Sequence, residues 1–136
     1  MAYDEGVLSR DAIASAAIRT NRICKQGASD QVTEANANDA PIGISPDGIH
    51  DQDSANAADA GDQFRLAYAG FKKLTAGGAI TAGAYIKSDA DGKGVVISTT
   101  PGAAAQNYIG IARTAVSGTG ITFTCQIMPG VRAFTT

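Results

Sequence analysis

The chain has 136 residues, 44% of them hydrophobic, and a formal net charge of −2. A chain of this length can bury about two-thirds of its surface on folding, so it needs no disulfide framework, and two Cys do not make one. The charge argues against general polyanion binding. No apolar run is long enough to cross a membrane, and the acidic start Met1–Glu5 does not fit a secretory signal.

The first 18 residues are predicted to form an N-terminal arm ahead of a second unit over residues 19–136. Apolar residues from Val7 to Ala17 have loose helical spacing, and Ser9 is a possible N-cap for a short helix over residues 10–17. A helix this short is marginal alone. It would need a partner surface on its own domain or on another subunit.

The rest of the chain is predicted to be all-β, because 13 Ile and 6 Val stand against 3 Leu, and Gly and Thr are frequent. About nine short strands would form a small barrel or sandwich. A loop over residues 46–62 interrupts them, and loops of this length are often functional. The expected strands are residues 18–25, 31–35, 41–45, 64–68, 71–74, 84–88, 94–98, 107–115 and 121–128.

Turn and face assignments follow from the local patterns. Asp91-Gly92 between two strands predicts a hairpin with a type I′ turn, which needs positive φ at both central residues. Alternation places two sets of residues on single strand faces: Phe64, Leu66 and Tyr68 in one strand, and Ile121, Phe123, Cys125 and Ile127 in another.

A weak internal repeat is present. Lys25, Val32 and Ile42-Gly43-Ile44 recur as Lys87, Val95 and Ile109-Gly110-Ile111. Each Ile-Gly-Ile is followed by a Gly-rich turn and an alternating strand that ends in Gly. The pattern indicates two similar β halves.

Charge is uneven along the chain. Residues 30–62 contain eight acidic residues and no Lys or Arg, while the remaining residues carry five acidic and eleven basic ones. One interpretation is an acidic loop that is simply solvated. The other is an acidic surface that arranges identical copies of the chain side by side, with the acidic segment of one copy against the basic part of the next.

The sequence offers little for catalysis or metal binding. His50, the single histidine, lies in the acidic loop and has no oriented partner in the pattern. Asp89–Gly94 resembles a calcium loop, but Lys93 occupies a ligand position. A divalent cation at Asp47, Asp51 and Asp53 is left open. We therefore expect no enzyme activity, no cofactor and no metal. Whether Cys24 and Cys125 approach each other is also left open.

A longer run carries a family resemblance. Residues Gly77–Val95, together with Ala40–Ser45, Tyr108–Ala112 and Pro129-Gly130, resemble the small capsid decoration, or cement, proteins of tailed phages. The resemblance extends over roughly residues 19–130. It implies a β-tulip-like or barrel-like fold and homotrimers that bind the major capsid protein on the exterior of the virion. The chain would then be made in the bacterial host cytoplasm, without nucleic-acid or membrane partners, and no catalytic residue carries over.

A mechanical function follows from this resemblance. Bridging adjacent subunits would stabilise the expanded shell, the form that presents all the binding sites together. The expected capsid contacts lie in the arm, on Tyr3, Val7, Leu8, Arg10 and Ile13. The alternative is a virion-surface or tail β domain that binds host glycans, and exposed aromatic residues around one rim would favour it.

Overall fold

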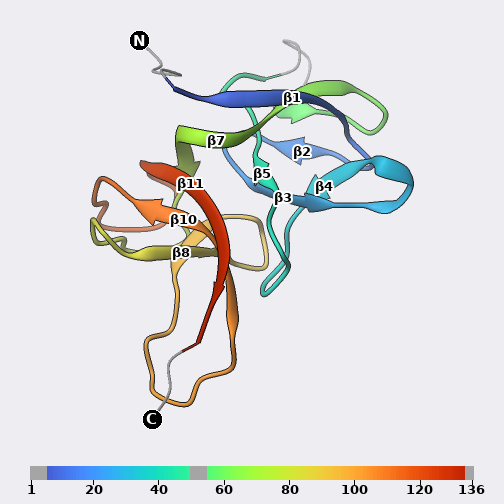
Figure 1. Cartoon of the computed structure of the whole chain (residues 1–136). Coiled ribbons are helices and arrows are strands. Elements are labelled where there is room, and N and C mark those ends of the chain that lie inside the picture. The colour runs from blue at the N-terminus through green and yellow to red at the C-terminus, as the bar shows by residue number, and fades with distance from the viewer. Residues whose placement is uncertain (1–5, 50–54, 134–136) are drawn as a thin grey trace.

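Within the residues described by the computed structural model, 6–49 and 55–133, the chain is all-β as predicted (Figure 1). Its only helical element in those ranges is the short 3-10 turn η1 (Ala28–Asp30), and none of them forms a helix suited to crossing a membrane. The strands are β1 (Leu8–Ile13), β2 (Ile18–Arg19), β3 (Ile23–Gln26), β4 (Val32–Glu34), β5 (Gly43–Ile44), β6 (Asn56–Ala58), β7 (Gln63–Thr75), β8 (Tyr85–Ser88), β9 (Gly94–Val96), β10 (Gln106–Ala112) and β11 (Thr122–Arg132).

One large sheet organises the fold. Its strands follow the order β4-β3-β5-β7-β11-β10-β8-β9, and β1 pairs with β7 off this path. The 13-residue β7 joins the two sides, since its first part pairs with β1 and β5 and its second part pairs with β11. Figure 1 shows β7 running below β1 before it turns towards β11. A separate small sheet contains β2 and β6.

The bend in β7 corrects two predictions. The chain continues as one strand through Gly70, where two strands were expected. Gly70 takes a left-handed φ of 97°, and a side chain there would lie 2.7 Å from the Cα of Val7. The register with β1 also shifts at Tyr68, which interrupts the alternation of inward and outward residues there. Phe64 and Leu66 are buried, whereas Tyr68, expected on the same face, is 41% exposed. Lys72 is buried further along the strand.

The predicted helix over residues 10–17 is wrong. Residues 8–13 form β1, which is antiparallel to β7. Ser9 caps no helix, because its carbonyl and hydroxyl oxygens accept hydrogen bonds from Arg65 Nη2 at 3.1 and 3.3 Å. Pairing with a preformed neighbouring strand satisfies backbone groups that a short isolated helix would hold only marginally.

The body of the protein supplies the partner surface for this first segment. Ala12, Ala14 and Ile18 belong to one of the two buried apolar clusters, together with Phe64 and Leu66. The other cluster lies around residues such as Leu74, Ile86, Ile109 and Phe123. The segment from residue 8 to residue 18 is therefore integrated into the core. The loop over residues 46–62 also contains a strand, because β6 pairs with β2.

The hairpin at residues 89–93 is confirmed, although its turn is not type I′. Strands β8 and β9 pair through Ser88 and Gly94, and of the turn residues only Gly92 has a positive φ. The Asp89 carboxylate accepts hydrogen bonds from the backbone N–H groups of Asp91 and Lys93 at 2.8 and 2.9 Å. These bonds stabilise a five-residue turn and occupy the carboxylate that a calcium loop would use.

The sheet order supports the internal repeat. Strands β4-β3-β5-β7 on one side correspond to β9-β8-β10-β11 on the other, read outward to inward. Gly43 pairs with Cys24, and Gly110 pairs with Ile86 in the equivalent place. A side chain at either glycine would collide with the next strand, β7 or β11. One proposed match of the repeat is off by one residue. Lys87 pairs with Val95, but Lys25 pairs with Thr33, so Thr33 and not Val32 is the counterpart of Val95.

Candidate functional site

Strand β1 presents three of the five predicted contact residues to solvent. Leu8 is 56% exposed and Ile13 is 46% exposed, and Arg10 is also exposed. Val7 instead packs against the core cluster that contains Leu74 and Phe123, so it helps to hold β1 on the body. Tyr3 lies outside the described residues.

Polar contacts fix the outer side of β1 to β7. Arg65 Nη1 donates to Asp11 Oδ1 at 2.9 Å, while its other amino group holds Ser9. Both charged side chains are mostly exposed, at 61% and 59%, so this ion pair contributes at most about 1 kcal/mol to stability. The two residues are directly paired across β1 and β7, so the ion pair is consistent with the register of these strands.

Part of the acidic segment forms ion pairs with basic residues elsewhere in the chain. Arg19 Nη2 pairs with Glu34 at 2.8 Å, and Lys25 Nζ pairs with Asp39 at 2.8 Å. The hydrogen bond from Lys25, aided by the Asn36 backbone N–H, holds the pKa of Asp39 below its ordinary value. The bond to Glu34 is the main cause that raises the pKa of Arg19. Three acidic residues of the segment, Glu34, Asp39 and Asp47, therefore pair with basic residues from outside it.

A metal site finds no support in the described residues. No group of three His, Cys, Asp or Glu side chains gathers there in a way that would hold an ion. Of the three candidate ligands, Asp47 pairs with Lys72. Asp51 and Asp53, like His50, lie outside the described residues.

The two cysteines are free and buried in separate clusters. Cys24 lies in the cluster with Ile18, and Cys125 lies in the cluster with Phe123. Burial raises the pKa of both thiols, that of Cys125 to about 12. Each behaves as a small apolar side chain that resists ionisation.

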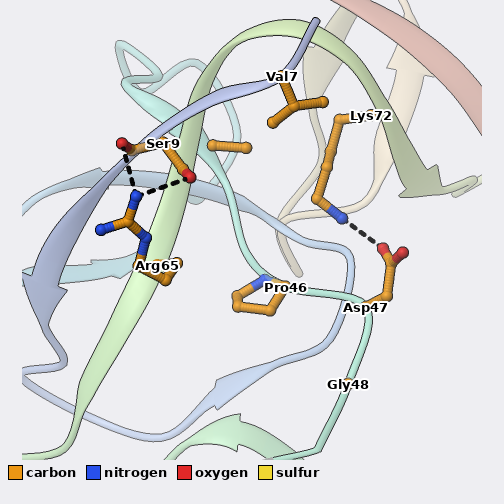
Figure 2. A pocket seen from close by; sticks show the side chains of 8 residues that line it. Val7, Ser9, Pro46, Asp47, Gly48, Arg65 and Lys72 are labelled. Carbon is orange, nitrogen blue, oxygen red and sulfur yellow. Dashed lines mark hydrogen bonds and ion pairs between the residues drawn. The ribbon is translucent and has the colours of Figure 1, made fainter. Parts of the chain in front are cut away.

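A second feature, which the sequence patterns did not reveal, is a cavity of about 300 Å³ between β1, β7 and the segment after β5. Figure 2 shows Lys72 and Asp47 pointing towards each other at one side of it, and Arg65 bonded to Ser9 at another. The Lys72 side chain is only 6% exposed. Lys72 continues the alternation of the buried Phe64 and Leu66, so a charged residue at an inward position was a usable signal, but the strand break expected at Gly70 separated it from that pattern.

Comparison with known proteins gives a fold. No protein-family model matches the chain, and no curated protein matches it. Among solved structures, the chain is similar to the crystal structure of the head fiber gp8.5 N base in bacteriophage phi29. The TM-score is 0.61 at 20% identity, over 90% of this chain and 94% of that one. At this identity the likeness establishes a shared all-β fold over nearly the whole of both chains.

Proposed function

We propose that this chain is a structural protein of a phage virion that binds the exterior of the capsid. The observation that carries the proposal is the likeness in fold to a phage head fiber base, which covers nearly all of both chains. The sequence resemblance to capsid decoration proteins supports the finer proposal. In that proposal the chain is a β-tulip-like homotrimer that cements neighbouring major capsid protein subunits and stabilises the expanded shell.

The proposed capsid contact is strand β1 with its exposed side chains. Leu8 and Ile13 are large apolar side chains that are exposed to solvent at the two ends of the strand, and Arg10, on the same strand face as Leu8, is exposed too. β1 pairs with β7 on one side along its length, and among residues 6–49 and 55–133 most of its other edge has no strand partner, so it offers backbone hydrogen-bonding groups. Edges of this kind bind extended segments of partner chains through backbone hydrogen bonds, and pockets for exposed side chains add specificity.

The glycan-binding alternative has less support. Tyr85 packs edge-on against Tyr108 with ring centroids 4.9 Å apart, and the Arg132 guanidinium covers the Tyr85 ring at 4.4 Å. A sugar ring stacks on an open aromatic face. The chain itself therefore uses one face of Tyr85 that such a ligand would need.

The test is co-sedimentation of the full chain with expanded capsids stripped of surface proteins. We expect the wild type to pellet with the shells and to have a solution mass near three times 13.8 kDa by light scattering. The double variant Leu8→Ser, Ile13→Ser should lose at least about tenfold in apparent affinity, the loss expected from two interface anchors.

A matched control keeps the interpretation specific. Ile121 and Val131 are 46% and 65% exposed but belong to the other half, so the double variant Ile121→Ser, Val131→Ser should bind like the wild type. Equal losses in both double variants would reject β1 as the contact. A wild type that stays in the supernatant would reject capsid binding altogether, and a monomeric mass would reject the trimer alone.

A further inference from the structure

Three chain segments meet beside the cavity and are tied together by backbone hydrogen bonds. The Asn21 N–H donates to the Pro46 carbonyl at 3.0 Å, and the Asn21 carbonyl accepts from the Thr75 N–H at 3.0 Å. The hydroxyl of Ser45 accepts from the Arg22 N–H at 2.8 Å and donates to the Arg19 carbonyl at 2.7 Å. The segments around residues 21, 46 and 73 are therefore held in fixed positions.

Each segment contributes one polar side chain to the junction. Lys72 lies opposite the buried Cys125 on the core face of the sheet, and Asn21 is 9% exposed. Lys72 Nζ donates to Asp47 Oδ1. The neighbours of the Asn21 amide are acceptors on the side that fixes its orientation, and with the amide nitrogen assigned to that side it donates to the same oxygen at 2.5 Å and to the Lys73 carbonyl at 3.1 Å.

This grouping contains every component of an amide-forming reaction. Lys72 supplies an amine nucleophile, Asn21 supplies a carboxamide, and Asp47 supplies an acid that contacts both. Because both nitrogen atoms touch one carboxylate oxygen, they are separated by no more than the sum of two hydrogen-bond lengths. We propose that Lys72 and Asn21 join through an intramolecular isopeptide bond, with Asp47 as the proton carrier.

The reaction balances without any co-reactant. The Lys72 ammonium passes a proton along its hydrogen bond to Asp47, which leaves a neutral amine and a carboxylic acid. The amine nitrogen attacks Asn21 Cγ, and the Asp47 acid gives its proton to the departing amide nitrogen. The C–N bond to that nitrogen breaks, the secondary amide forms, and ammonia leaves. Ammonia takes up the proton that the attacking nitrogen releases, so Asp47 returns to its ionised form.

The surroundings favour this chemistry in three ways. The Lys72 side chain is only 6% exposed and its Nζ donates directly to Asp47 Oδ1, so the proton donor and acceptor are already in contact. The fixed backbone holds the reacting groups together, and such positioning can contribute about 7–11 kcal/mol to a rate. Lys72 and Asp47 also line the cavity of about 300 Å³, which offers ammonia an exit. The bond would tie β7 covalently to the turn before β3, so these strands would resist separation.

The decisive experiment maps the wild-type full chain after denaturation and digestion with trypsin, so it does not depend on any variant folding. A bond at Lys72 blocks cleavage there. Mass spectrometry should then find a branched peptide that joins Thr20–Arg22 to Leu66–Lys73, lighter by about 17 Da than its two parts, the mass of the ammonia that the lysine displaces. Finding only linear Thr20–Arg22 and Leu66–Lys72 would overturn the proposal and leave an ordinary buried ion pair.

Variants then test the roles. Asp47→Ala retains both reacting groups, and we expect it to lose the branched peptide. Asn21→Gly removes the carboxamide but tolerates the left-handed φ of 54° at this position, so it should also lose the branch. Lys73→Met changes the neighbouring exposed lysine and should keep the branch. A loss of about 18 Da between Lys72 and Asp47, the mass of water, would instead place the bond on the carboxyl group and overturn the proposed role of Asn21.

Discussion

Gly110→Ala is expected to destabilise the fold strongly, because this glycine occupies a position with no room for a side chain. A methyl group there would lie 2.8 Å from the Gln126 carbonyl carbon and 3.1 Å from the Met128 nitrogen, where ordinary contacts begin at 3.4 Å. Strand β10 lies between β11 and β8, so it cannot retreat from one neighbour without pressing on the other.

The cost can be estimated from what must move. Separating β10 from β11 weakens about two backbone hydrogen bonds, each worth roughly 1 kcal/mol, and loosens the packing of Ile109 and Ala112. The sum is about 3 kcal/mol, out of a total stability of roughly 5–15 kcal/mol. With a urea m-value of about 1–3 kcal/mol/M, the unfolding midpoint should fall by roughly 1–3 M.

Urea unfolding followed by far-UV circular dichroism measures this directly. Gly118→Ala is the matched control, because a methyl group there has no atom within 4 Å and its φ is not left-handed. We expect the control to stay within about 1 kcal/mol of the wild type. If Gly110→Ala unfolded at the same urea concentration as the control, the close approach of β10 to β11 would be refuted.

Three further predictions concern the core and the ionisable groups. Ile18→Ala should cost about 2–5 kcal/mol in urea unfolding because Ile18 is fully buried, whereas the exposed Leu8→Ala should cost under about 1 kcal/mol; similar values would mean that the first segment is not part of the core. The raised thiol pKa values of Cys24 and Cys125 predict slow alkylation at pH 8 until urea unfolds the chain, and fast labelling of the native protein would contradict this. The stability that the buried neutral thiols contribute should be lost as the pH rises above 9.0, the ordinary thiol pKa. Because the pKa of Asp39 is lowered, its carboxylate stabilises the fold above pH 3.8, the ordinary pKa, and this stabilisation is lost as the pH falls further. Asp39→Asn should therefore reduce the dependence of the unfolding free energy on pH in the acid range. An unchanged dependence would show that the ion pair is not maintained in solution.

The sequence predicts those strands that carry strong alternation. The pattern Phe123, Cys125 and Ile127 gave the buried face of β11 correctly, although Ile121 precedes the strand and is 46% exposed. The Asp91-Gly92 signal located a hairpin because glycine is needed for positive φ in either turn type. These features depend on local chemistry, which a single sequence contains.

The missed elements depend on contacts between distant segments. β6 consists of Asn56, Ala57 and Ala58, whose small or polar side chains give no strand signal, and its pairing with β2 forms it. The helix assigned to residues 10–17 failed for the same reason, since Ala12 and Ala14 suit either periodicity. The Lys72 junction was invisible because three distant segments build it.

The internal repeat shows where this chain departs from a symmetric β body. The two halves correspond through four strands each, and three strands have no counterpart: β1, β2 and β6. All three belong to the first half, and each contributes a buried residue, Ala12, Ile18 or Ala58, to the same core cluster. Additions that build their own core can acquire an outer surface without disturbing the repeated strands. The exposed residues Leu8 and Ile13 lie on one of these additions, which is where a binding surface specific to this chain is expected.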